Sequence, residues 1–160
     1  MANMTQGVDR PTKYAEQLQQ YGLVGYTNYQ GGSAAWTAYK GGVAVMDVSD
    51  VDGYAQKKIS SVNAAADDVF LGVFAETVAV TASDAADGAQ KARVWRDGIH
   101  AFAKNGLAAT DIGAPAYASD DQTITTTSSN NLWIGYIVDV DATYVWVDIT
   151  RAAGMANSAT

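Results

Sequence analysis

Residues 132–149, LWIGYIVDVDATYVWVDI, decide the fold class. In their last six positions Val145, Val147 and Ile149 alternate with Tyr144, Trp146 and Asp148. This period of two is typical of a half-buried β-strand, whose successive side chains point to opposite faces. We therefore expect the β-branched side chains to face a core, and Trp146 to face a second layer, a partner or solvent.

Strand-like segments recur from residue 43 onward, with turn residues between them. They are residues 43–48, 69–74, 77–81, 91–96, 99–103, 115–119, 122–127, 132–140 and 143–149. Asp97-Gly98 lies between two alternating segments, so we expect a hairpin there. This spacing predicts an all-β protein with a compact antiparallel barrel or sandwich. Little helix is expected beyond one turn in Leu107–Ile112 and a short helix in Pro11–Tyr21.

Two of the predicted strands share a central glycine. Gly72 lies in Phe70-Leu71-Gly72-Val73, and Gly135 lies in Trp133-Ile134-Gly135-Tyr136. A glycine inside an apolar strand marks a bulge or a close approach of another backbone. We expect each glycine to bend its strand over the core, although the similarity is too short to define a repeat.

The first 42 residues differ in composition from the rest and are expected to form an N-terminal arm. Residues 43–150 then form the β domain and residues 151–160 a C-terminal tail. The arm combines glycines with large rings, which favours docking onto a neighbouring protein. The residues predicted to bind that partner are Tyr14, Leu18, Tyr21, Tyr26, Tyr29 and Trp36. The alternative is that the arm wraps its own domain.

Composition narrows the classes of function. The formal net charge of −7 argues against nucleic acid, whose binding needs clustered Lys and Arg. No apolar stretch is long enough to cross a bilayer, and the N-terminal residues show no signal-peptide pattern, so no membrane contact is expected. The chain has no Cys, which excludes disulfides and Cys-based zinc sites. We expect no cofactor and no metal.

Catalytic groups are few. His100 is the only histidine, and its alternating segment predicts a half-exposed strand position. Asp120-Asp121 has the composition of a turn, and Asp139 and Asp141 lie near a strand end. All four acids are expected to be solvated rather than to bind calcium or to form a catalytic pair.

Residues 69–149, about half of the chain, resemble the small β-barrel decoration (cement) proteins of tailed-bacteriophage heads. The resemblance lies in the order of the pieces Phe70–Val73, Gly88, Val94–Gly98, Asp111–Tyr117, Ser119–Asp121, Trp133–Tyr136 and Val145–Ile149. It implies a non-enzymatic, commonly trimeric protein that clamps adjacent major capsid subunits on the outer surface of the virion. The absence of Cys agrees with synthesis in the host cytoplasm. The family has no catalytic residue to transfer. Its shorter members lack the aromatic N-terminal part, which leaves open whether that part contacts the shell, a sister subunit or a fibre.

Two other functions are compatible with the sequence. A glycan-binding or adhesin-like module would use Trp95, Trp133 and Trp146 if their rings lined an open groove. A hydrolase would need two of the carboxylates to face each other across a cleft.

Overall fold

The computed structural model of the chain describes residues 3–7, 12–47, 53–59 and 68–157. Its regular structure is almost entirely β, which confirms the predicted fold class. The helical elements in these ranges are two short 3-10 turns, η1 (Tyr29–Gly31) and η2 (Ala109–Asp111). The second of them confirms the turn expected in Leu107–Ile112. None of the helical segments in the described ranges is long and apolar enough to span a membrane.

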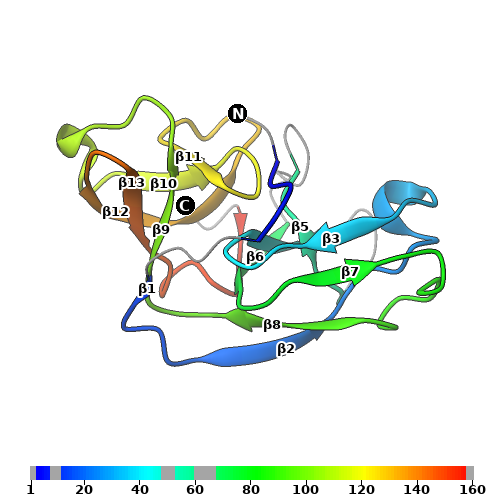
Figure 1. The fold of residues 1–160 in the computed structure, drawn as a ribbon. Coiled ribbons are helices and arrows are strands. Elements are labelled where there is room, and N and C mark those ends of the chain that lie inside the picture. Colours follow the sequence, from blue (N-terminus) through cyan, green and yellow to red (C-terminus); the bar gives the residue numbers. More distant parts are fainter. Residues whose placement is uncertain (1–2, 8–11, 48–52, 60–67, 158–160) are drawn as a thin grey trace.

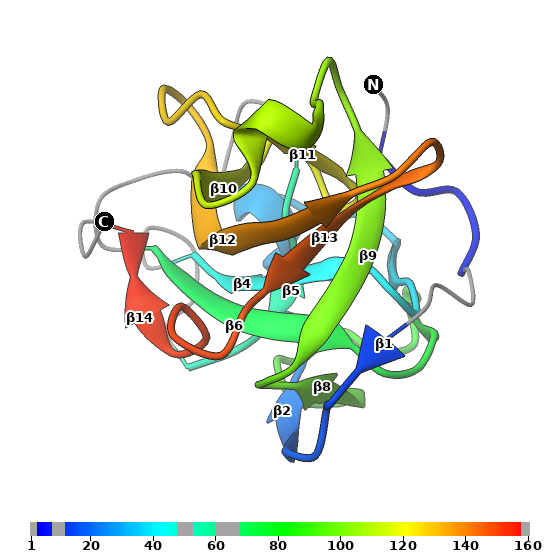
Figure 2. The same cartoon turned by 90° about the vertical axis from the view of Figure 1, so that its left-hand side faces the viewer.

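The C-terminal half forms a closed five-stranded barrel, which we call the second barrel (Figure 2). Its strands are β9 (Ile99–Lys104), β10 (Pro115–Ala118), β11 (Thr123–Thr125), β12 (Leu132–Val140) and β13 (Tyr144–Asp148). Around the ring the order is β9-β11-β10-β12-β13, and β13 pairs again with β9. Only β9 and β11 are parallel. Val145, Val147 and Ile149 are fully buried in its core, as the alternation predicts.

The N-terminal half forms another ring, which we call the first barrel (Figure 1). Its strands are β2 (Leu18–Gly22), β4 (Val43–Met46), β5 (Gln56–Lys57), β6 (Val69–Phe74) and β8 (Lys91–Trp95), paired in the order β2-β8-β6-β4-β5. Leu23 then makes a parallel bridge with Ala55, just before β5. The Val24 N–H donates to the Ala55 carbonyl at 3.0 Å, and the Ala55 N–H donates to the Gly22 carbonyl at 2.9 Å. This bridge closes the ring around a separate apolar core.

The two barrels have the same topology and the same register. In each, the first strand in the chain is parallel to the third, and the remaining neighbours are antiparallel. A bulge occurs at the same place in both. The pairs that flank it are Ala44 with Gly72 and Val45 with Phe70 in the first barrel, and Ala116 with Gly135 and Tyr117 with Trp133 in the second. The chain is therefore an internal duplication of one five-stranded ring.

Gly72 and Gly135 allow the close backbone approach that the sequence predicts. Their φ angles are 139° and 141°, which side-chain-bearing residues rarely adopt. A Cβ on Gly72 would lie 2.0 Å from the Trp95 carbonyl oxygen, and one on Gly135 would lie 2.1 Å from the Asp148 carbonyl oxygen. Each glycine lets the fourth strand of its ring curve against the fifth.

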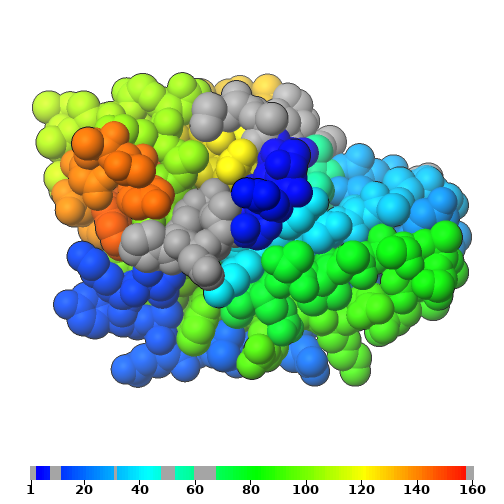
Figure 3. All heavy atoms as spheres, viewed as in Figure 1, coloured from blue at the N-terminus to red at the C-terminus, as the bar shows by residue number. Residues whose placement is uncertain are grey.

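Four short strands extend the barrels. β1 (Thr12–Lys13) pairs with β9, and β14 (Met155–Ala156) returns to pair with β6. β3 (Trp36–Ala38) and β7 (Val78–Val80) form a two-stranded sheet beside the first barrel. Because these strands involve residues 12–42 and 155–156, the proposed arm and tail contain segments that pair with the rest of the chain. In Figure 3 the cyan segment around β3 lies against the green segment around β7.

The helix predicted for Pro11–Tyr21 is wrong. Pro11 itself lies outside the described residues, and those that follow form β1, a turn and β2. An isolated helix of about ten residues is marginal in water. Residues 18–22 instead gain a complete antiparallel ladder with β8, which outweighs the weak helical pattern.

The Asp97-Gly98 hairpin is also wrong. β8 pairs with β2 and β6, whereas β9 pairs with β1, β11 and β13, so these residues form the corner between the two barrels. Gly98 has a φ of 91°, and a Cβ there would lie 2.8 Å from Cα of Ala15. The Asp97 carboxylate accepts hydrogen bonds from two backbone N–H groups of the β1–β2 turn. Contacts with that turn therefore replace the hairpin ladder.

Replacing Gly135 by Ala is expected to destabilise the protein far more than replacing Gly106 by Ala. Gly106 also has a positive φ, 69°, but a Cβ there meets nothing within 4 Å. Gly106→Ala should therefore cost only the backbone strain, about 1–2 kcal/mol. Gly135→Ala adds a collision with backbone and should cost at least about 3 kcal/mol in the free energy of unfolding, measured by urea denaturation. Equal losses in the two variants would contradict the close approach.

Candidate functional site

Two of the residues predicted to bind a partner lie inside the first barrel's core. The rings of Tyr29 and Trp36 are buried and stack with their centroids 5.0 Å apart. The indole N–H of Trp36 donates to the Val24 carbonyl at 2.9 Å. Tyr21 and Tyr26 are half-buried and pack against the same core. For these four residues, the arrangement matches the alternative in which the segment packs on its own chain.

Tyr14 and Leu18 are the two predicted residues that face solvent, with exposed fractions of 82% and 43%. Tyr14 has a φ of 58°, a left-handed conformation uncommon for a residue with a side chain. Strained residues of this kind persist where surrounding structure enforces them, and they cluster at functional sites.

The turn that carries Tyr14 is fixed by the corner between the barrels. Oδ1 of Asp97 accepts hydrogen bonds from the N–H groups of Glu16 and Gln17, both at 2.9 Å. The Arg96 N–H donates to the Gln17 carbonyl at 2.9 Å. The turn therefore holds the Tyr14 ring on a fixed backbone. No local pattern in the sequence indicates this, because Asp97 is distant from the turn in the chain.

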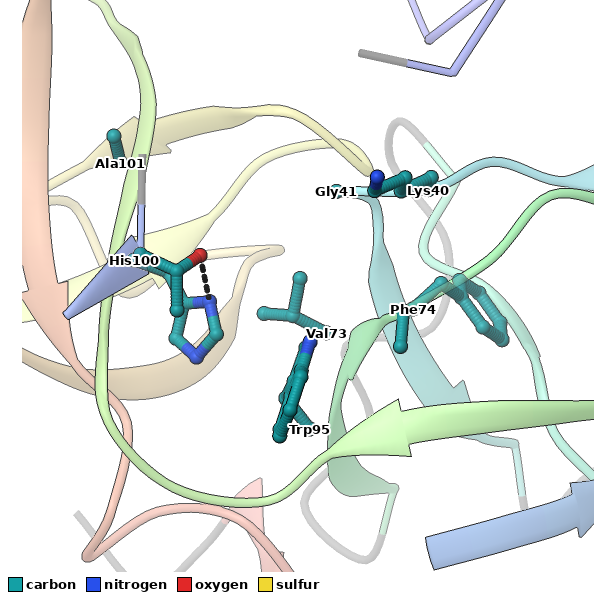
Figure 4. A pocket seen from close by; sticks show the side chains of 9 residues that line it. Lys40, Gly41, Val73, Phe74, Trp95, His100 and Ala101 are labelled. Carbon is teal, nitrogen blue, oxygen red and sulfur yellow. Dashed lines mark hydrogen bonds between the residues drawn. The ribbon is translucent and has the colours of Figure 1, made fainter. Parts of the chain in front are cut away.

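His100 lies in the junction between the barrels, beside a small cavity of about 40 Å³ (Figure 4). The predicted half-exposed position is wrong, because the side chain is buried. Its Nε2 lies 2.8 Å from the Asp97 carbonyl, which can only accept, so Nε2 carries the hydrogen. Nδ1 then accepts from the Thr12 hydroxyl at 3.3 Å. Burial lowers the pKa of His100, and the neutral ring ties β1 to the corner.

Asp120 and Asp121, predicted to be solvated, are buried. The turn geometry itself is as expected, since Oδ1 of Asp120 accepts hydrogen bonds from the N–H groups of Gln122 and Thr123 at 2.9 and 2.8 Å. Oδ1 of Asp121 accepts from the Met4 N–H at 2.8 Å. Its Oδ2 is buried and has no hydrogen-bond partner within the described part of the chain. Long-range packing of the N-terminal residues and the first barrel covers this turn, which local composition does not reveal.

A buried lysine faces the same turn. Nζ of Lys58, just after β5, donates to the carbonyls of Ile59 and Ser119 at 2.7 and 3.4 Å. Burial lowers its pKa to about 8, against the opposing attraction of the charges of Asp120, Asp68 and Asp121. Burial also raises the pKa of Asp121 to about 6. This buried polar cluster joins the two barrels, and sequence reasoning missed it because lysines are ordinarily exposed.

Within the described ranges, the acids Asp139 and Asp141 and the tryptophans of the glycan-binding alternative do not line a common cleft. Asp139, near the end of β12, and Asp141, in the β12–β13 turn, are exposed, as predicted. Asp141 accepts a hydrogen bond from the Trp146 indole at 2.9 Å. Trp133 and Trp146 are buried, and Lys13 Nζ lies 4.6 Å from the Trp146 ring centroid. Trp95 is half-buried beside the His100 cavity. These rings do not line the open groove that the glycan-binding alternative requires.

In the described ranges, no three His, Cys, Asp or Glu side chains lie together in a way that could hold a metal ion.

An open groove of about 490 Å³ lies on the surface of the second barrel. Ile112, Tyr136 and Val138 line it with exposed apolar side chains, and Asp148 and Arg151 complete its wall. Exposed apolar side chains that gather in one hollow mark an interaction surface. We refer to it as the barrel-2 groove. Together with Tyr14, it makes the candidate site a binding surface.

Comparison with protein-family models, curated proteins and solved structures found no match to this chain.

Replacing Asp121 by Asn should change how stability depends on pH. Because the folded-state pKa is about 6 and the ordinary value is 3.8, the folded protein retains a proton that the unfolded chain has lost between these values. The contribution of Asp121 to stability therefore falls as pH rises from about 4 to about 6. Between pH 4 and pH 7, the free energy of unfolding of Asp121→Asn should therefore rise by about 2–3 kcal/mol relative to that of the wild type.

Urea unfolding at several pH values measures this gain, with Asp139→Asn as the exposed control. Identical pH profiles for the wild type and Asp121→Asn would contradict the burial of a charged Asp121.

Proposed function

We propose that the protein is a structural virion protein that binds the outer surface of an assembled phage capsid and stabilises it by bridging major capsid subunits. The resemblance of residues 69–149 to head decoration proteins supports this function. The structural observation that carries it is the exposed Tyr14 ring, presented by a turn that Asp97 fixes.

A tyrosine in this setting is suited to anchor a protein interface. Aromatic side chains dominate the binding energy of interfaces when they enter a pocket on the partner. Binding normally costs entropy because side chains and loops become ordered. The Tyr14 backbone is ordered by the fold itself, so less of that cost remains at the moment of docking.

The junction between the barrels suits a bridging role. A bridge between two capsid subunits must hold its contacts at a fixed separation. The buried Lys58 cluster joins the two barrels, and the His100 contacts tie β1 to the corner between them, through groups that are costly to expose singly. The molecule then acts as one body between its contact points.

Charge and mass action support the outer surface. A chain of charge −7 is repelled by packaged DNA, so the outside of the shell is the favourable side. A protein that binds only the assembled lattice stabilises that lattice in proportion to its occupancy. We propose the major capsid protein and further copies of this chain, as a homotrimer, for its partners.

The test is binding of the purified protein to capsids of the phage that encodes it, measured by co-sedimentation and by the thermal stability of the shells. Tyr14→Asn removes the ring while keeping a residue that tolerates the left-handed conformation. We expect about a tenfold or larger loss of affinity for Tyr14→Asn and no change for Met155→Ala, an exposed apolar side chain on β14. Failure of the wild type to bind capsids would overturn the function, and unchanged binding of Tyr14→Asn would overturn the role of this ring.

A further inference from the structure

The internal duplication relates the barrel-2 groove to the cavity at the junction. The shared register matches Val73 with Tyr136 and Trp95 with Asp148. The pairing of β6 with β8 and of β12 with β13 also matches Phe74 with Ile137. Gly41 and Gly113 correspond because each lies three residues before the matched residues Ala44 and Ala116. The first residue of each pair lines the junction cavity, and the second lines the groove. The two hollows are therefore the same site on the two copies of the ring.

Backbone hydrogen bonds support this match. The Gly41 N–H donates to the Phe74 carbonyl at 2.8 Å, and the Gly113 N–H donates to the Ile137 carbonyl at 2.8 Å. Both glycines have positive φ, 85° and 92°. The reverse bonds are also equivalent, with 2.9 Å from the Phe74 N–H to the Gly42 carbonyl and 3.0 Å from the Ile137 N–H to the Ala114 carbonyl.

The two sites differ in whether anything covers them. On the first barrel, His100 and Ala101 of β9 and Thr12 of β1 close the site to about 40 Å³ (Figure 4). On the second barrel nothing in the described chain takes that position, and the open volume is about 490 Å³. Ile112, Tyr136 and Val138 there have exposed fractions of 48%, 37% and 39%.

The covering strand also has an uncovered equivalent. β2 pairs with β8 as β9 pairs with β13, so Gln19 corresponds to His100 and Gln20 to Ala101. Leu18, Gln19 and Gln20 are all exposed. One end of the molecule thus carries an open groove, and the other carries an exposed strand of the type that covers such a groove.

We propose that the barrel-2 groove binds β2 of a second copy of this chain, head to tail. This contact between two chains would repeat the interface that joins the two barrels within one chain. The groove wall carries both Asp148 and Arg151, and the exposed Arg151 offers Glu16, which is exposed just before β2, an opposite charge. A contact of this kind joins two different surfaces. Repeated from copy to copy, it gives a closed ring if the rotation returns to the first copy. In stacked repeats each unit contacts its neighbours, and a terminal unit has one face without a neighbour.

The test uses the protein alone, so it is independent of capsid binding. One variant, Val138→Asp, places a charge in the groove and leaves β2 intact. The other, Leu18→Glu with Gln20→Glu, changes β2 and leaves the groove intact, and Gln20→Glu lies opposite Arg93, which favours the fold. Circular dichroism checks that both variants are folded.

Sedimentation velocity at roughly 100 μM, in the micromolar-to-millimolar range of weak association, measures the oligomeric state. The wild type should associate, each variant should be monomeric, and Met155→Glu should behave as the wild type. A 1:1 mixture of the two variants should form a heterodimer and nothing larger. The intact β2 of Val138→Asp can bind the intact groove of the other variant, and no second pair of intact surfaces is left.

A monomeric wild type would overturn the proposal. So would a variant that associates as strongly as the wild type does. A mixture of the variants that stays monomeric would also overturn it, because a head-to-tail contact requires complementation. Loss of capsid binding with self-association intact would refute the proposed function alone.

Discussion

The close approach of two backbones at Gly72 and at Gly135 is the constraint on which both barrels depend. At each site the carbonyl of the neighbouring strand occupies the space that a Cβ would need. The approach curves the fourth strand enough for a ring of only five strands to close around a small core. The same glycine, bulge and partner carbonyl recur in both halves. The two barrels therefore curve their fourth strands in the same way.

The junction between the barrels is held in a different way. Its buried contacts are both apolar and polar. Val43, Val45 and Phe70 of the first barrel belong to the same apolar cluster as the second barrel's core. The polar contacts are those of the neutral His100 ring with Thr12 and Asp97, and that of the Lys58 ammonium group on the turn before β11. Polar groups buried away from water are costly when a partner is lost, so they specify one arrangement of the barrels more strongly than apolar packing does. This arrangement fixes the turn that carries Tyr14.

Much of the architecture can be predicted from local pattern, and the rest depends on distant contacts. The alternation of Val145, Val147 and Ile149 predicts their strand. The two central glycines predict a close approach of another backbone. β2 has no such pattern in its own sequence. It forms a strand because its ladder with β8 stabilises it. The buried Asp121 accepts a hydrogen bond from Met4, which lies 117 residues earlier in the chain. The duplication is hidden because equivalent side chains differ, as Val73 and Tyr136 do, while their pairing is the same. Tyr14 and Leu18 are the predicted binding residues that the fold leaves exposed.

The measurement that tests this account most directly is the NMR detection of cross-strand nuclear Overhauser effects between Leu23 and Ala55 in isotope-labelled protein. This parallel bridge turns the N-terminal sheet into a closed ring, and it corresponds to the β9–β11 pairing of the second barrel. We expect backbone cross-peaks between Leu23 and Ala55, and between Ala103 and Thr123, in the same spectrum. Cross-peaks for the second pair without the first would show an open N-terminal sheet and contradict the duplicated barrel.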